Sequence, residues 1–123
     1  MPANDPVVPL SSEPDLDAAF AESRKRPVFL FKHSPTCPVS AMAWAEFRAF
    51  APAAAAAGAA LRVVDVLAAR GVSRLAAERT NVKHESPQAL VLKDGVVRRH
   101  ASHGSLVVEW FESALEAVSG PPK

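Results

Sequence analysis

Short apolar runs alternate with longer amphipathic segments along most of the chain. The short runs are rich in β-branched and aromatic residues and are bounded by prolines, glycines or charges, which is typical of buried strands. The dipeptide Asp94-Gly95 lies between the last two runs and predicts a tight β-hairpin. Strands are therefore predicted at Pro27–Lys32, Leu61–Val66, Gln88–Lys93 and Val96–His100.

The longer segments carry apolar residues at helical spacing, and they predict four helices. The first helix has Leu16, Ala19 and Phe20 on one face, and Ser12 or Asp15 is its candidate N-cap. The other three are expected from Pro38 towards Gly58, from Gly71 to about Arg79, and from Leu106 to Val118.

Two residues inside these helices carry specific expectations. Pro52 lacks an N–H donor and its ring meets the preceding turn, so it is expected to kink the second helix or to end it early. Ser73 is the candidate N-cap of the third helix, because serine commonly accepts a hydrogen bond from the first helical turn.

The predicted order of elements is α-β-α-β-α-β-β-α. Right-handed crossover connections make the first strands parallel, and the hairpin adds an antiparallel edge. This order predicts an α/β, thioredoxin-like fold with a central four-stranded mixed sheet flanked by helices. Residues 15–120 are expected to form one domain, and residues 1–14, which contain four prolines and no periodic pattern, an irregular lead-in.

Composition narrows the class of protein without revealing any chemistry. The 123 residues contain 14 Lys and Arg against 13 Asp and Glu, a formal net charge of +1. This balance argues against a nucleic-acid partner, which would need a concentrated basic face. The first residues lack a signal-peptide pattern, and the longest apolar stretch, residues 49–61, is too short to span a bilayer. We therefore expect a cytoplasmic protein without a membrane partner.

Cys37 is the single cysteine, which excludes an internal disulfide and a zinc site built from cysteine pairs. It lies between the end of a predicted strand and the start of a helix, where free N–H groups and the helix dipole favour a thiolate. Lys32 and His33 end that strand and are expected to add to the positive field. The alternative is an inert, half-buried core cysteine, and position alone does not decide between the two.

The residues around Cys37 are similar to a two-cysteine redox motif in which Ser40 replaces the second sulfur. Thr36 and Pro38 flank the thiol, and Pro38 suits the first helical position because its missing N–H costs nothing there. Ser40 cannot resolve a mixed disulfide. Its hydroxyl can donate a hydrogen bond to a thiolate, or it can satisfy backbone groups in the first turn.

The four histidines fall near the ends of predicted strands. His33 can raise the positive charge near Cys37 or shuttle a proton, or it can simply bond to backbone. His84 lies in the loop before the third strand, where it can line a groove or be solvated. His100 and His103 are three residues apart, so they do not share a strand face, and no third ligand is evident. No metal site is therefore expected.

Motifs in three segments carry a resemblance to a known family. Phe31-Lys32-His33-Ser34 with Cys37-Pro38-Val39-Ser40 is followed by Val82-Lys83-His84-Glu85-Ser86-Pro87-Gln88 and then by Ser102-His103. In this order they resemble the YtxJ-like monothiol bacilliredoxins over roughly residues 15–118. These are thioredoxin-fold proteins associated with the low-molecular-weight thiol bacillithiol.

The resemblance implies removal of bacillithiol from S-bacillithiolated client proteins. Cys37 would be the nucleophile that accepts bacillithiol as a mixed disulfide, and bacillithiol or another external thiol would then regenerate it. Pro87 would be a cis-proline facing Cys37, and the backbone of Ser86 would pair with an extended substrate. His84 and His103 would line the thiol groove. Bacillithiol is then a co-substrate, and no tightly bound cofactor is implied.

Two other classes of function stay open. Monothiol glutaredoxins use a similar single-cysteine site to hold an iron–sulfur cluster between two chains, so a cluster or metal carrier is one alternative. A non-catalytic thioredoxin-fold adaptor is the other, and its partner binding would be unaffected by Cys37→Ser. A peroxidase is disfavoured, because Thr36 adjoins Cys37 and the Pro-x-x-x-Thr-x-x-Cys spacing of peroxiredoxins is not met.

Overall fold

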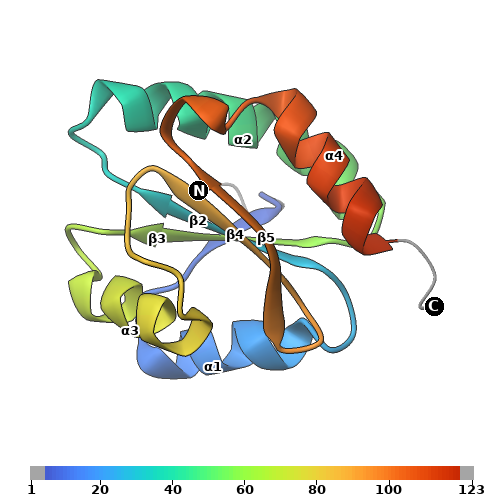
Figure 1. The fold of residues 1–123 in the computed structure, drawn as a ribbon, viewed down its shortest axis with the longest axis horizontal. Helices are drawn as coiled ribbons and strands as arrows, with labels where there is room; N and C mark the ends of the chain where they lie inside the picture. Colours follow the sequence, from blue (N-terminus) through green and yellow to red (C-terminus); the bar gives the residue numbers. More distant parts are fainter. Residues whose placement is uncertain (1–4, 120–123) are drawn as a thin grey trace.

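The computed structural model describes residues 5–119, which form one mixed five-stranded sheet with two helices on each face (Figure 1). No helix in this part of the chain is long and apolar enough to cross a membrane. The strands are β1 (Val7–Pro9), β2 (Val28–His33), β3 (Ala60–Asp65), β4 (Gln88–Lys93) and β5 (Val96–Ser102). The helices are α1 (Glu13–Glu22), α2 (Pro38–Ala56), α3 (Arg70–Thr80) and α4 (Val108–Ser119), and a 3₁₀ turn, η1 (His103–Ser105), precedes α4.

The strand order across the sheet is β1-β3-β2-β4-β5. β1, β3 and β2 run parallel, whereas β4 is antiparallel to β2 and β5 is antiparallel to β4. The parallel crossover and the antiparallel hairpin are both as predicted. Asp94 and Gly95 have φ angles of 56° and 81°, and two positive angles in succession are what a two-residue type I′ hairpin turn requires.

The N-terminal segment differs from the predicted irregular lead-in. Val7–Pro9 forms β1 and pairs with β3, Val7 lying opposite Leu61. Ser12 caps α1, its hydroxyl accepting a bond from the Asp15 N–H at 3.3 Å, so the helix begins inside the predicted lead-in. Three residues are too few to show a pattern, and their partner strand is far along the chain. Residues 1–4 of the lead-in and residue 120 of the predicted domain lie outside the described residues.

Of the two effects predicted for Pro52, an early end of the helix does not occur, since α2 continues to Ala56. The proline ring faces solvent, where the carbonyl left without its N–H partner can bind water instead. Alanines on either side favour the helix intrinsically, and Ala51 and Ala54 are buried against the core. Packing of this face outweighs the one missing hydrogen bond.

Ser73 is not the N-cap of α3, contrary to the prediction. The helix begins at Arg70, and its N-cap Ala69 makes no side-chain hydrogen bond. Ser73 lies inside the helix and is 2% exposed. Its side chain and carbonyl therefore face the sheet, and both contribute to a buried polar cluster described below.

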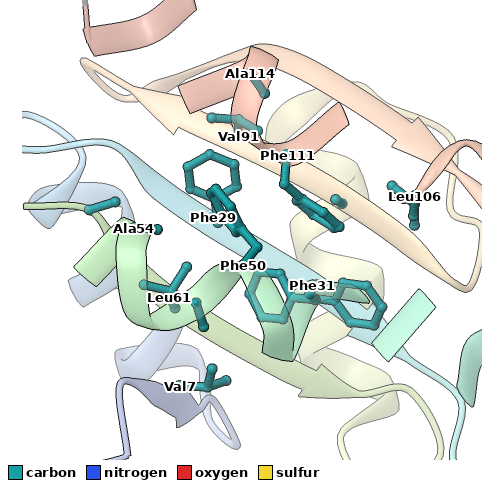
Figure 2. Close-up of a cluster of buried hydrophobic side chains, with 14 of the residues drawn as sticks. Val7, Phe29, Phe31, Phe50, Ala54, Leu61, Val91, Leu106, Phe111 and Ala114 are labelled. Carbon is teal, nitrogen blue, oxygen red and sulfur yellow. The ribbon is translucent and has the colours of Figure 1, made fainter. Parts of the chain in front are cut away.

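The sheet face under α2 and α4 carries an aromatic core. Phe29 and Phe31 of β2 point towards this face and pack with Phe50 and Phe111 (Figure 2). Phe111 is fully buried, and its ring lies 5.3 Å from that of Phe50, centroid to centroid. This cluster joins both helices to the strand that leads to Cys37.

The opposite face, under α1 and α3, carries a separate aliphatic core. Val28 and Leu30 of β2 belong to it. Because consecutive strand residues point to opposite faces, the side chain of Lys32 falls on the α1 and α3 side and that of His33 on the α2 and α4 side. The side chains of the last two residues of β2 therefore pack against different helices.

Candidate active site

Three segments converge at the end of the sheet where β2 finishes. The start of α2, the start of α3 and the loop before β4 all lie at this end (Figure 1). The Val66 N–H, just after β3, donates to the His33 carbonyl at 3.0 Å. The β2–β4 register pairs Lys32 with Gln88, so one residue further His33 and Pro87 face each other. The predicted cysteine and proline motifs are thus neighbours in the fold.

Cys37 is the N-cap residue of α2, with extended backbone angles (φ −102°, ψ 123°), and it is partly exposed. Its N–H donates to the Ser34 carbonyl at 3.2 Å, which closes the loop after β2. No side chain caps α2, so the N–H groups of Val39 and Ser40 lack a side-chain acceptor. Pro38 occupies the first helical position, as predicted. An anionic sulfur at Cys37 would therefore lie beside unsatisfied donors and the positive end of the helix dipole.

Ser40 is fully buried and serves the loop rather than the thiol. Its Oγ accepts a bond from the Ser34 N–H at 2.9 Å and lies 2.7 Å from His33 Nδ1. Of the two roles predicted for this hydroxyl, satisfying backbone groups is the one present, and none of its bonds goes to Cys37. Ser40 holds the loop that carries Cys37 against the end of β2. Thr36, beside the thiol, is exposed.

His33 is fixed in place by an aromatic neighbour as well as by Ser40. Its ring stacks on Trp44 of α2, with 5.0 Å between centroids and 17° between planes. Burial holds the pKa of His33 below its usual value, and the nearby Asp65 opposes this only in part. The lowered pKa favours the neutral form of His33 near pH 7, so the ring adds little positive charge beside Cys37 and stays available to exchange a proton.

Lys32 does not point towards Cys37, contrary to the expectation that it adds to the thiol's positive field. Its side chain is fully buried on the α3 side of the sheet. Nζ donates to the Ser73 carbonyl at 3.1 Å and contacts His84 Nδ1 at 3.2 Å. Burial lowers the pKa of Lys32 to about 8. The ammonium has neutral partners only, which is unusual for a buried charge.

This burial makes stability depend on pH in the alkaline range. The pKa of Lys32 falls from 10.5 to about 8, so between these values the folded chain has lost a proton that the unfolded chain retains. Stability should therefore rise with pH across this window, by about 3 kcal/mol in the free energy of unfolding. Urea unfolding measured in steps from pH 8 to 10.5 would check the expected rise.

Lys32→Met should remove this rise, whereas Lys25→Met, at an exposed position, should leave it intact. A flat profile for the natural chain, or a rise that survives Lys32→Met, would contradict the prediction.

His84 and Gln88 complete the polar cluster around Lys32. His84 Nδ1 lies 3.2 Å from the Ser73 hydroxyl as well as from Lys32, and the pKa of His84 is lowered by burial and by the lysine charge. Gln88 pairs with Lys32 across the strands and is 1% exposed. Its Nε2 donates to the Lys83 carbonyl at 2.9 Å, while its Oε1 has no partner among the described residues. The cluster thus anchors the loop that precedes Pro87.

Pro87 and His103 lie on the other side of the candidate site. The Ser86-Pro87 peptide bond is cis, as the resemblance implies, and Ser86 is half-buried in front of it. The His103 N–H donates to the Pro87 carbonyl at 3.0 Å. A largely apolar groove of about 350 Å³ runs from His103 to the first turns of α2, where Val39 and Met42 are 44% and 72% exposed. His103 therefore lines a groove beside the thiol-bearing turn.

The structure of residues 5–119 contains no group of side chains suited to bind a metal ion. No three His, Cys, Asp or Glu side chains gather there in a way that could hold an ion.

The comparisons with known proteins agree with this geometry. The chain matches the family described as monothiol bacilliredoxin BrxC over residues 8–110. The chain belongs to the monothiol bacilliredoxin family. Membership gives it a thiol redox role and confirms the family resemblance carried by the motifs in three segments.

Solved structures confirm the thioredoxin-like fold class. One described as having a thioredoxin fold is 33% identical, with a TM-score of 0.77 and coverage of 88% of this chain and 92% of that chain. A Malassezia sympodialis thioredoxin is 14% identical, with a TM-score of 0.75 and coverage of 93% and 91%. A Halobacterium salinarum thioredoxin is 13% identical, with a TM-score of 0.75 and coverage of 100% and 99%. The two thioredoxins are evidence for the fold alone.

Sequence reasoning missed several residues of this region. Trp44 lies in the predicted second helix and was assigned no role at the site, yet it positions His33. Ser73 was expected as a helix cap, yet it holds Lys32 and His84. The alternation of side chains along a strand was the available signal, because it places Lys32 and His33 on opposite faces of the sheet.

Proposed function

We propose that this chain removes bacillithiol from S-bacillithiolated proteins by monothiol exchange, with Cys37 as the nucleophile. The observation that carries the proposal is the position of Cys37, the uncapped N-terminus of α2 at the sheet end that also holds cis-Pro87. Unsatisfied first-turn donors favour a thiolate, which is the reactive form. The chain contains no second cysteine that could resolve the product.

In the proposed reaction the Cys37 thiolate attacks the bacillithiol sulfur of the client's mixed disulfide. The Cys37–bacillithiol disulfide forms as the client–bacillithiol disulfide breaks, and the client sulfur leaves as a thiolate that takes a proton from water. A second thiol, bacillithiol itself or another external reductant, then attacks the bacillithiol sulfur of the adduct and frees Cys37. Both steps exchange one disulfide for another, so no further oxidant is needed and no tightly bound cofactor takes part.

The groove beside the thiol accounts for client binding in this proposal. The backbone of Ser86 would pair with an extended client segment, as strand addition to an exposed edge does elsewhere. The apolar groove lined by Val39, Met42 and His103 would receive the client's side chains. Ser40, at the position of a resolving cysteine, keeps the loop in place and leaves the adduct intact.

Intact-mass spectrometry of both proteins tests the proposal. Mixed with a bacillithiolated client, the chain should gain the mass of one bacillithiol less two hydrogens, and the client should lose the same mass. A Ser40→Cys variant is the informative companion, since its new thiol should displace bacillithiol and leave an internal disulfide two hydrogens lighter than the reduced chain. An unmodified chain beside a still-modified client would contradict the proposal.

A further inference from the structure

A second pocket lies on the α3 side of the same sheet end. It has a volume of about 370 Å³ and is walled by Val66 and Leu67 after β3, by Arg70 and Arg74 of α3, and by His84. Val66 bonds to the His33 carbonyl, and Cys37 bonds to the carbonyl of the next residue, Ser34. The loop that carries His84 continues into cis-Pro87. The pocket is thus attached to both segments that form the candidate active site.

The pocket is rich in cations that lack acidic partners. Within residues 5–119, Arg70 and Arg74 form neither an ion pair nor a side-chain hydrogen bond. The arginines Arg48, Arg62 and Arg79, by contrast, each pair with an Asp or Glu. No acidic side chain is among the described residues that line the pocket. Both side chains are exposed to solvent, and they also border a neighbouring pocket that Glu13 and Glu78 line without pairing with them.

The buried Lys32 contacts two of the residues that line this pocket, Ser73 and His84. An ammonium group can only donate, so His84 Nδ1 accepts from Lys32 Nζ, and the ring proton of neutral His84 lies on Nε2. Lys32 itself is fully buried and does not line the pocket, so the donors that face it come from the two arginines and from His84. The pocket therefore presents donors and positive charge, with an apolar wall at Leu67, and this combination suits an organic anion.

We propose that this pocket binds the carboxylate end of the small thiol that Cys37 accepts. The inference rests on the proposed thiol exchange and adds a recognition site to it. The pocket has the size of a small-molecule site rather than of a protein interface. Arginine forks match the planar geometry of carboxylates, and the segment that carries Cys37 meets a wall of the pocket at the end of β2, where Val66 bonds to the His33 carbonyl.

A charge series of small disulfides tests the proposal directly. Dithiodiacetate carries carboxylates, bis(2-hydroxyethyl) disulfide is neutral and cystamine is cationic, and each would transfer one half to Cys37 while the other half leaves as a thiolate. Rates of adduct formation are measured by intact mass at physiological salt, where surface steering is screened. Arg70→Gln with Arg74→Gln should slow the dithiodiacetate reaction roughly tenfold and change the neutral one less than about twofold.

The matched control changes the same net charge elsewhere. Arg98→Gln with Arg99→Gln alters two arginines of β5, which do not line the pocket. This pair should leave the preference for dithiodiacetate unchanged. If Arg70→Gln with Arg74→Gln also left the preference for dithiodiacetate unchanged, the pocket would not bind the carboxylate. The proposed thiol exchange would be unaffected by that result. If all three disulfides failed to modify the natural chain, the proposed function would fail instead.

A second measurement does not depend on thiol chemistry. In the Cys37→Ser variant, succinate should shift the NMR signals of the His84 ring and of the Arg70 and Arg74 Nε–H groups. Butane-1,4-diol, the neutral counterpart, should leave them unmoved. Shifts produced by inorganic phosphate but not by succinate would overturn the carboxylate assignment, and an absence of shifts with both would overturn the anion pocket.

Discussion

Replacing Cys37 with serine should abolish bacillithiol transfer and at the same time make the protein slightly more stable. A serine hydroxyl is not ionised at neutral pH and does not attack disulfides, so the rate of client repair should fall to that of the solution without protein. Release of bacillithiol from a modified client, followed with time at fixed pH, measures this loss. The effect on activity is the largest that the structure predicts.

The gain in stability has a separate cause. Cys37 is the N-cap of α2 and makes no side-chain hydrogen bond, whereas serine is a preferred N-cap that accepts from the first turn. The variant should gain about 0.5–1 kcal/mol in the free energy of unfolding. A loss of activity together with a gain in stability shows that the variant lacks the nucleophile. A damaged fold would instead lower both activity and stability.

Thr36→Ser is the matched control for this variant, because Thr36 is exposed and adjoins the thiol. It should retain both the rate of transfer and the stability of the natural chain. Persistent transfer by Cys37→Ser would refute thiol exchange altogether, since the chain has no other cysteine.

Local patterns were sufficient to predict most of the fold. The runs at 28–33, 60–65 and 88–93 are strands within one residue of the predicted starts and ends. The Asp94-Gly95 turn has the positive φ angles that its sequence indicates. β1 escaped prediction because it has three residues and depends on pairing with β3. Pro52 does not end α2 for a related reason, since buried alanines on the other face of the helix outweigh its missing donor.

The candidate site was predictable only where it depends on neighbours in the sequence. Cys37 at a helix start and Pro87 at a strand start are visible from adjacent residues, and the fold brings them to one end of the sheet. The partners of Lys32, by contrast, come from α3 and from the loop before β4. Contacts of this range depend on which face of β2 packs against which helix. The sequence alone likewise does not show that Arg70 and Arg74 of α3 line one pocket, because its other walls come from distant segments.

Replacing Phe111 with alanine should produce the largest loss of stability. Its ring is fully buried and lies 5.3 Å from those of Phe47 and Phe50, centroid to centroid. Removing it leaves a cavity between α2, α4 and the sheet (Figure 2), because the neighbouring rings cannot all move in to fill the space. A loss of about 3–5 kcal/mol in the free energy of unfolding is expected, measured by urea denaturation.

Such a loss would remove a large share of the stability of a domain this size. Met42→Ala is the control, since that side chain is 72% exposed and its truncation should change stability by less than about 0.5 kcal/mol. A loss for Phe111→Ala no larger than that of the control would mean that α4 does not pack on the sheet as described. An intermediate loss of about 1–2 kcal/mol would show that α2 and α4 move in to fill the cavity. The stability lost on truncating a buried side chain depends on how far the surrounding structure collapses.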